Sequence, residues 1–282
     1  MTRKKKIIVL SIFVIIGVSA MLYFNPHSCA KRIVDSLDRG INVEEFEKCV
    51  KKNKNGVNAT YFCTGIWHII DVPNYYPIHY AVKAGDCDKV KILLDNGADA
   101  NKQDPTVNQS PLMFALRSGK ESRFKISQTL IDCGSDVFFE DERGASIIEE
   151  ACILTQHDSQ EVKIECAEFV KKMITITNYG NTYRTNSPII INAAAYENEV
   201  LLDYIVSNNI DDINATNITG TTPLIAAVRF GYSDAESKVA IKYLLEHGAN
   251  PHIKDDNGKT AYDYAVENGN TEVAELIKKD ME

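Results

Sequence analysis

The sequence predicts an all-α protein built from stacked helix–turn–helix units. The first observation is the stretch Tyr76–Asn101, YPIHYAVKAGDCDKVKILLDNGADAN, which holds two short amphipathic segments separated by a glycine. The second is that similar stretches follow, in degraded form, as far as the C-terminus. The third is composition, because 44% hydrophobic and 25% charged residues are ordinary for a folded chain. One such unit cannot bury its apolar faces alone, so neighbouring units must stack on it.

The stretch Tyr76–Asn101 shows how each unit is built. Pro77 suits the first turn of a helix, where its missing N–H would have no intrahelical partner. Apolar residues then share one helical face until Gly85 interrupts the pattern. The second helix is expected to end at Asn96-Gly97, because only Gly or Asn adopts the left-handed conformation at a helix end with little loss of free energy. A projecting loop, Ala98–Asn101, completes the unit.

The order of residues in this stretch resembles the ankyrin repeat. That motif reads T-P-L-H-x-A, then G, then L-L-x-x-G-A-D/N-x-N, at a period of about 33 residues. Tyr76 stands where the motif has threonine, and His79 matches its histidine, which by resemblance serves a hydrogen bond between repeats. The resemblance covers roughly Asp71–Lys279 and implies a solenoid of about six units.

Five further units follow, and two of them depart from the motif. They begin at Ser110, Asp141, Ser187, Gly220 and Asp255. The third unit lacks the proline and the closing glycine; its second helix is expected at Glu161–Met173, before an irregular link, Ile174–Asn186. The fourth unit has Asn208-Asn209 where the glycine belongs, and Asn tolerates the left-handed conformation second best. The fold is therefore expected to survive both departures.

The residues before the first clear unit, 25–74, predict an N-terminal helical cap. Val43–Val50 has apolar residues at helical spacing, and the strongly apolar stretch Tyr61–Ile70 contains the only tryptophan, Trp67. A terminal unit must differ from internal ones because its outer face meets water. We therefore expect three regions: 1–24, the cap at 25–74, and the repeats at 75–282.

Residues 1–24 predict a membrane-targeting element. A cluster of four cations, Arg3–Lys6, precedes the apolar run Ile7–Phe24. That run lies at the lower length limit for a membrane span and is long for the core of a signal peptide. The run is consistent both with a signal peptide cleaved after Ala20 and with an uncleaved membrane anchor. The alternative without targeting is a buried core helix. Both targeting interpretations place the repeats on the non-cytoplasmic side, either anchored or periplasmic.

The predicted non-cytoplasmic location favours disulfide bonds between cysteines. In an oxidising compartment the seven cysteines would tend to pair. Cys49 with Cys63 is one candidate disulfide, and Cys152 with Cys166 is another, across one antiparallel helix pair. The alternative is that Cys152 and Cys166 are small core residues.

The sequence carries no motif of catalysis or cofactor binding. It contains no H-E-x-x-H, G-x-S-x-G, P-loop, Rossmann or C-x-x-C pattern. A net charge of −8 argues against nucleic acid and mildly favours a basic protein partner. We therefore expect a non-enzymatic chain with no cofactor, no metal and no small-molecule substrate, whose partners are a protein and, through residues 1–24, a membrane.

The candidate binding residues come from the repeat architecture that the resemblance implies. In ankyrin-like stacks, loop tips and the inner faces of the first helices form one strip that varies without harming the core. Tyr, Arg, Phe and Met are residue types that anchor protein interfaces. The expected contact residues are Tyr75, Tyr80, Lys83, Gln109, Met113, Arg117, Ile218, Arg229, Phe230, Lys259, Tyr264 and Glu267.

Together these observations predict a protein-binding module of the cell envelope. Ankyrin proteins with a signal segment resemble bacterial envelope proteins, some of which are immunity partners that block a toxin. The resemblance implies that an acidic concave surface occludes the active site of a secreted effector, such as a periplasm-acting lipase. The alternative function is an envelope scaffold, or a stress-related ankyrin protein, that supports another enzyme.

Overall fold

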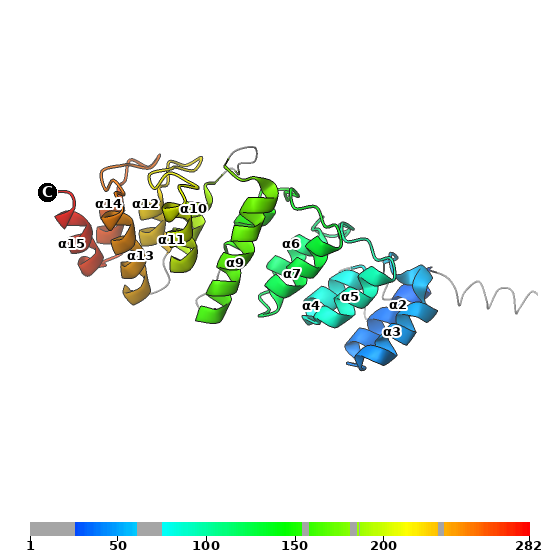
Figure 1. Cartoon of the computed structure of the whole chain (residues 1–282). Helices are drawn as coiled ribbons and strands as arrows, with labels where there is room; N and C mark the ends of the chain where they lie inside the picture. The colour runs from blue at the N-terminus through cyan, green and yellow to red at the C-terminus, as the bar shows by residue number, and fades with distance from the viewer. Residues whose placement is uncertain (1–25, 61–74, 154–157, 181–184, 186, 231–233) are drawn as a thin grey trace, which may run out of the picture. The chain divides into compact units, whose positions relative to one another are not determined.

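The computed structural model describes part of the chain, as helices joined by turns (Figure 1). The described residues are 26–60, 75–153, 158–180, 185, 187–230 and 234–282. They include an isolated antiparallel bridge, Glu140–Ser146, but no strand. Within these ranges no helix has the length and apolar character needed to cross a membrane. Residues 1–24 and Tyr61–Ile70 lie outside the described part, so the targeting element and the site of Trp67 stay predictions.

The chain divides into two compact units, Met1–Asp136 and Val137–Glu282, which we describe separately. The helices of the first unit are α2 (Pro26–Asp38), α3 (Val43–Lys52), the short 3₁₀ helix η1 (Lys54–Gly56), α4 (Pro77–Ala84), α5 (Cys87–Asp95), α6 (Pro111–Leu116) and α7 (Arg123–Asp132). The first helices of successive pairs, α2, α4 and α6, contact one another, and so do the second helices, α3, α5 and α7. This double row is the predicted stack.

Local sequence explains where these helices begin and end. Pro77 opens α4, and Gly85 closes it with a φ of 78°. The Asp86 side chain accepts a hydrogen bond from the backbone of Lys89 and so caps α5. Ser110 caps α6 in the same way. The helix boundaries are therefore set by proline, glycine and capping side chains that can be recognised in the sequence.

The core of the first unit lies between the two rows of helices. Its completely buried side chains include Ile33, Phe46, Ile78, Leu93, Leu112 and Ile126. At the N-terminal pair, η1 approaches α2 so closely that a Cβ on Gly56 would lie 2.1 Å from the backbone nitrogen of Ala30. Only glycine allows that contact, which closes the pair α2–α3.

Neighbouring repeats within each unit are joined by a recurring contact that we call the asparagine clasp. The Asn101 side chain donates to the carbonyl of Gly134 (2.9 Å) and accepts from the N–H of Asp136 (2.7 Å). The clasp recurs as Asn58 with Gly97 and Asp99, and as Asn214 with Gly248 and Asn250. Because Asn58 follows α3, the predicted cap is attached to its neighbour in the manner of a repeat.

The second unit contains four further helix pairs in its described residues. Its helices are α8 (Ile147–Ala151), α9 (Gln160–Thr177), α10 (Ile189–Ala195), α11 (Glu199–Ser207), α12 (Pro223–Phe230), α13 (Asp234–Glu246), α14 (Ala261–Glu267) and α15 (Thr271–Lys279). The first helices α8, α10, α12 and α14 contact one another in sequence, as do the second helices α9, α11, α13 and α15. The double row of helices is therefore present in both units.

The third repeat departs from the prediction in the length of its second helix. We expected this helix at Glu161–Met173, but α9 runs on to Thr177. Ile174 and Thr177 are buried, and the Thr177 hydroxyl donates to the carbonyl of Met173. Burial thus outweighs the weak helix propensity of the β-branched residues. The irregular link begins only at Asn178, whose φ is 52°.

The fourth repeat survives its unusual residues as expected. Asn209 adopts the left-handed conformation, with a φ of 51°, at the place where other repeats have glycine. Glu197 is also left-handed, with a φ of 54°, and ends the first helix of the pair. A difference from the motif is that Pro188 occupies the cap position before α10 instead of its first turn.

Between the third and fourth repeats, side chains other than a clasp make the connection. The Tyr179 hydroxyl accepts from the N–H of Ile189 (3.2 Å) and lies 3.4 Å from a carboxylate oxygen of Asp211. Glu149, nearly buried, accepts from the N–H of Ser187 at 3.0 Å. Burial raises the pKa of Tyr179, and the charge of Asp211 adds to that effect. Tyr179 therefore remains a neutral hydroxyl.

The asparagine clasp can be tested by an isosteric change. In Asn101→Asp the side chain loses its donor and places a negative charge beside the Gly134 carbonyl, so we expect a loss of about 1 kcal/mol in the free energy of unfolding. Urea denaturation measures it. The matched control is Asn217→Asp. The Asn217 side-chain oxygen accepts hydrogen bonds from Thr219 and Thr221, and an aspartate oxygen can accept the same bonds. Equal losses in the two variants would contradict the role assigned to the clasp.

Candidate functional site

An aromatic cluster in the first unit gathers some of the expected contact residues. Partly exposed Tyr75 lies with its ring centroid 5.2 Å from that of Phe114 and 5.8 Å from that of Tyr80. His79 stacks on the same Tyr75 ring at 5.9 Å. Phe114 was not among the expected residues, although its position in α6 corresponds to that of Tyr80 in α4. The repeat register could have identified it.

His79 supports this cluster from inside. It is completely buried, and its Nε2 lies 3.4 Å from the carbonyl of Gln109 in the next repeat, the interaction that the ankyrin resemblance implies. Among the described residues, its Nδ1 finds no hydrogen-bond partner. Burial lowers the pKa of His79 to about 4, although the negative charge of Asp104 acts in the opposite direction. At neutral pH the ring is therefore uncharged, and its role is structural.

The other expected residues of the first unit lie apart from the aromatic contacts or beneath them. Lys83 is exposed in the last turn of α4, while Gln109 and Arg117 are half-buried. Met113 is wrong as a contact residue, because its side chain is completely buried. It occupies the position in α6 that His79 occupies in α4, which faces the neighbouring helices instead of the solvent.

A second cluster, which we call the Arg229 cluster, lies in the second unit and comprises Arg229, Phe230, Lys259, Tyr264 and Glu267. The Arg229 guanidinium lies 5.0 Å from the ring centroid of Phe230 and 4.7 Å from that of Tyr264. Phe230 is 50% exposed. Adjacent helices supply the residues, since α12 contacts α14. All five were expected contact residues, and here they do lie together.

Asp255 organises the Arg229 cluster from beneath. Its carboxylate is buried and accepts hydrogen bonds from the Tyr264 hydroxyl (2.6 Å), from Asn257 and from the backbone of Lys259. Burial raises the pKa of Asp255, but these hydrogen bonds outweigh it and hold the pKa below its ordinary value. Asp255 is thus a carboxylate that fixes the Tyr264 ring. The sequence shows it only as the start of a D-x-x-G turn.

Lys259 and Glu267 form the edge of the cluster. Their charged groups are 2.7 Å apart, and the Lys259 ammonium lies 5.4 Å from the centroid of Tyr264. A hydrogen bond to Glu267 raises the pKa of Lys259. The pair is solvent-exposed, so its effect on stability is small. Its structural consequence is that Lys259 already has an anionic partner.

Ile218 extends the exposed surface beside the cluster. It is 82% exposed on a turn that also carries Thr221, whose hydroxyl meets the Arg229 guanidinium at 3.5 Å. The turn is packed against the next one, because Asp256 donates its N–H to the carbonyl of Thr219. A Cβ on Gly220, whose φ is 70°, would lie 3.0 Å from a side-chain oxygen of Asp256.

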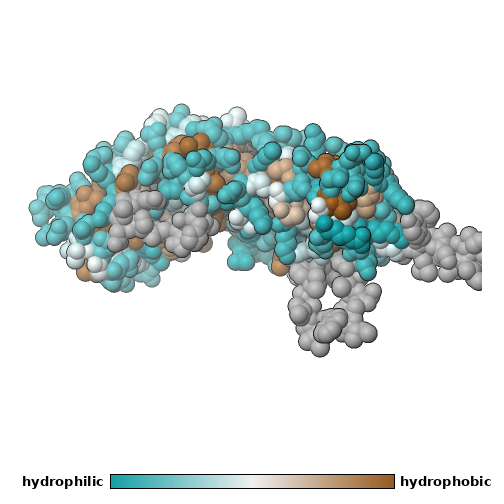
Figure 2. Space-filling model, turned by 90° about the horizontal axis from the view of Figure 1, so that it is seen from below, coloured by the Kyte–Doolittle hydropathy of each residue, from teal (hydrophilic) through white to brown (hydrophobic). Residues whose placement is uncertain are grey.

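The expected contact residues differ in charge from the chain as a whole. The chain is acidic, yet these residues include four cations, Lys83, Arg117, Arg229 and Lys259, against a single carboxylate, Glu267. The acidic binding surface stays a prediction, which these residues by themselves do not favour. On the face shown in Figure 2, hydrophobic residues occupy separate patches within a mostly hydrophilic surface. Such patches suit an interface that mixes apolar and charged contacts.

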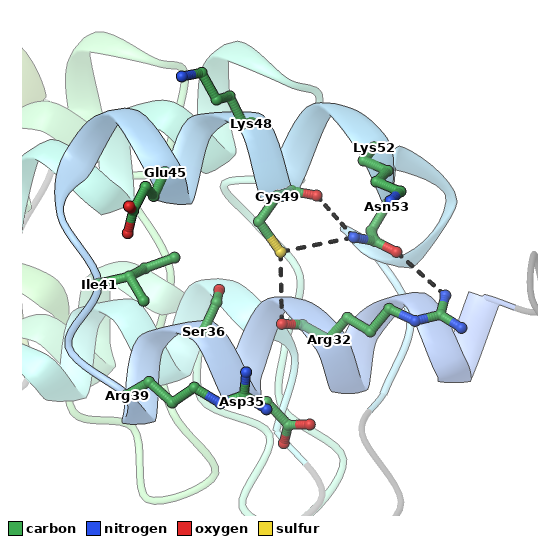
Figure 3. Close-up of a pocket in the computed structure, with 10 residues that line it drawn as sticks. All are labelled: Arg32, Asp35, Ser36, Arg39, Ile41, Glu45, Lys48, Cys49, Lys52 and Asn53. Carbon is green, nitrogen blue, oxygen red and sulfur yellow. Dashed lines mark hydrogen bonds between the residues drawn. The ribbon is translucent and has the colours of Figure 1, made fainter.

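A groove of about 400 Å³ lies between α2 and α3 in the first unit (Figure 3). Arg32 donates to Asn53 (3.2 Å), which in turn donates to the carbonyl of Cys49 (2.8 Å). The lining mixes cations with the carboxylates of Asp35 and Glu45. In the described part of the chain, no group of three His, Cys, Asp or Glu side chains could hold a metal ion.

Cys152 and Cys166 are close to each other in the core of the third repeat. Both are completely buried, and each thiol donates a hydrogen bond of 3.2 Å, to the carbonyls of Ile148 and Ala151 respectively. Burial raises the pKa of Cys152 well above its ordinary value, and Cys166 adds to the effect. Of the other candidate pair, Cys49 donates to the carbonyl of Arg32, while Cys63 lies outside the described residues.

The thiols provide a direct test of the disulfide hypothesis. We expect Cys152 and Cys166 to be reduced and unreactive in the folded protein, because both are completely buried and burial also raises the pKa of Cys152. Mass spectrometry after iodoacetamide treatment should show modification of exposed Cys133, and of the buried pair only after unfolding. An unmodified pair after unfolding, with a mass lower by about 2 Da, would show a disulfide instead.

The pH dependence of stability tests the state of His79. Its pKa of about 4 in the folded protein lies below the ordinary 6.5, so the unfolded chain binds the proton first as the pH falls. We expect the free energy of unfolding to be unaffected by His79 above pH 7 and to fall by about 2 kcal/mol at pH 5. Urea denaturation should show this loss in wild type and in the exposed control His252→Asn, but not in His79→Asn. Parallel losses in all three would contradict it.

Comparison with known proteins assigns the family. The family model described as ankyrin repeats matches residues 42–141, 78–176 and 190–282. The ankyrin repeat protein YahD of Escherichia coli (strain K12) is 27% identical over 197 residues, which is 70% of this chain and 92% of YahD.

Two solved structures extend the comparison. A chain from the complex of the predatory endopeptidase Bd0816 of Bdellovibrio bacteriovorus with the immunity protein Bd3460 is 25% identical, with a TM-score of 0.53 over 72% of this chain and 96% of that one. The human ASB11 ankyrin repeat domain is 20% identical, with a TM-score of 0.62 over 88% and 96%, and shows the fold alone. With its helix pairs, its clasps and the family match over most of its length, this chain belongs to the ankyrin-repeat family.

Proposed function

We propose that this chain is an immunity-type protein of the cell envelope that binds and neutralises a secreted hydrolytic effector. Ankyrin repeats mediate protein binding, and no catalytic family is indicated for this chain. The observation that carries the proposal is the Arg229 cluster, where exposed aromatic and cationic side chains rest on buried Asp255. Rigid aromatic and arginine side chains of this kind are the usual anchors of protein interfaces.

The similarity to a chain from an endopeptidase–immunity protein complex supports the inhibitory role. That complex pairs an endopeptidase with an immunity protein. An ankyrin surface can block a hydrolase by covering its active-site cleft, which requires no chemistry from the inhibitor. The effector is then an enzyme that attacks the envelope, such as a lipase or a peptidase.

The proposed location in the cell envelope rests on residues 1–24. A basic cluster followed by an apolar run directs a chain to the membrane, and the repeats then act on its outer, periplasmic side. Helix α2 begins at Pro26, directly after the apolar run. The repeats would therefore be positioned where an effector enters the periplasm.

Co-expression tests the proposal. The effectors to test are secreted hydrolases encoded by genes next to that of this chain. Cells that export the matching hydrolase are expected to survive when the chain is present and to lyse when it is absent. The envelope fraction should contain both proteins as a complex. The double variant Arg229→Glu with Tyr264→Ala should lower survival at least about tenfold, because it reverses the charge and removes the ring that holds it.

The matched control is Lys242→Glu, which reverses an exposed charge on the second helix α13 of the same unit. It should protect as well as wild type. Full protection by the double variant would exclude the Arg229 cluster as the binding surface. Absence of protection and of a complex for wild type would contradict the immunity function itself, and recovery of an envelope enzyme that stays active would favour a scaffold.

A further inference from the structure

Arg229 is held firmly but uses few of its hydrogen-bond donors. A guanidinium carries five N–H donors in a planar fork. In the described part of the chain, its polar contacts are the Thr221 hydroxyl at 3.5 Å and a carboxylate oxygen of Asp255 at 3.7 Å. The first is at the limit of a hydrogen bond, and the second is beyond it. The Arg229 side chain nevertheless remains only 29% exposed.

The nearest carboxylate, Asp255, forms an ion pair with Arg229 but no close hydrogen bond, because its oxygens serve other groups. The Asp255 oxygens accept from Tyr264, Asn257 and the backbone of Lys259 at 2.6 to 3.2 Å. Glu267, the other acidic member of the cluster, is paired with Lys259 at 2.7 Å. The positive charge of Arg229 is therefore only loosely matched within the described residues.

The aromatic rings fix the direction of the guanidinium in advance. Phe230 and Tyr264 both lie within about 5 Å of it, a range at which a ring face attracts a cation. The Tyr264 ring is itself fixed by its 2.6 Å hydrogen bond to buried Asp255. An arginine oriented in this way loses little conformational entropy when it meets an anion, which favours binding.

We propose that Arg229 receives a carboxylate from the partner, on a segment where an Asp or Glu lies beside an aromatic or aliphatic side chain. The carboxylate fits the planar fork of the guanidinium, which can donate two parallel hydrogen bonds. The apolar neighbour covers Phe230 and Ile218, which are 50% and 82% exposed. This inference rests on the protein-binding function proposed above and specifies the chemistry of its partner.

The charge pattern favours an acidic partner segment over the basic partner that net charge suggested. Net charge acts over the whole surface and is screened by salt, whereas binding depends on the groups in direct contact. At the contact surface the group available to an incoming ligand is a guanidinium. A lysine can replace it only in part, because an ammonium keeps the charge but lacks the planar fork.

Peptide selection tests this proposal without knowledge of the partner. A phage-displayed library of linear dodecapeptides is selected on the full chain, with the Arg229→Gln variant as counter-selection. Enriched peptides should carry Asp or Glu next to an aromatic or aliphatic residue. Synthetic copies should bind Arg229→Gln about tenfold more weakly than wild type, and Arg229→Lys with intermediate affinity. Replacing the peptide Asp by Asn, or Glu by Gln, should cause the same loss.

The controls separate this inference from folding and from the immunity function. Lys242→Gln removes an exposed charge from α13 and should leave peptide affinity unchanged. Thermal unfolding of each variant should match that of wild type. If Arg229→Gln is unstable, the peptide affinity of Arg229→Lys is compared with wild type instead. Enriched peptides without carboxylates, a phosphorylated peptide that outcompetes them, or equal binding to Arg229→Gln would overturn the proposal. Carboxylate-dependent peptide binding without protection in co-expression would refute the immunity function alone.

Discussion

In the described part of the chain, three joints between neighbouring repeats depend on the amide side chain of a single asparagine: Asn58, Asn101 or Asn214. An amide carries both a donor and an acceptor, so Asn101 can satisfy the Gly134 carbonyl and the Asp136 N–H of the next repeat at once. Each bond is exposed and contributes only about 1 kcal/mol. Because the bonds come in pairs, they also fix the register of one loop on the next, which hydrophobic packing between helices determines less sharply.

The clasp matters for binding because the candidate contact residues stand on the loops and helix ends it positions. Asn214 joins its neighbour just before the turn that carries Ile218 and Thr221. That turn meets Arg229, and Asp255 then orients Tyr264 from the following loop. A series of polar contacts thus connects the repeat scaffold to the partly exposed Arg229. The same scaffold can present different side chains at these positions without changing its core.

Where the motif fails, other polar groups replace the missing contacts. The third repeat has no closing glycine, and α9 instead ends at left-handed Asn178. Tyr179 and Glu149 then connect it to the fourth repeat, because they accept hydrogen bonds from the backbone N–H groups of Ile189 and Ser187. These irregular connections satisfy the same physical demand as the clasp, since backbone groups at a repeat joint must find partners.

The sequence by itself determined the helix pairs, most of their ends and the left-handed turns, because proline, glycine, asparagine and capping side chains act on their immediate neighbours. It also identified all five members of the Arg229 cluster as expected contact residues. Only the tertiary structure decided that Met113 is buried, that α9 extends to Thr177, and that Asp255 lies beneath Arg229. Those outcomes depend on packing and hydrogen bonds between residues far apart in the chain, and no local pattern encodes them.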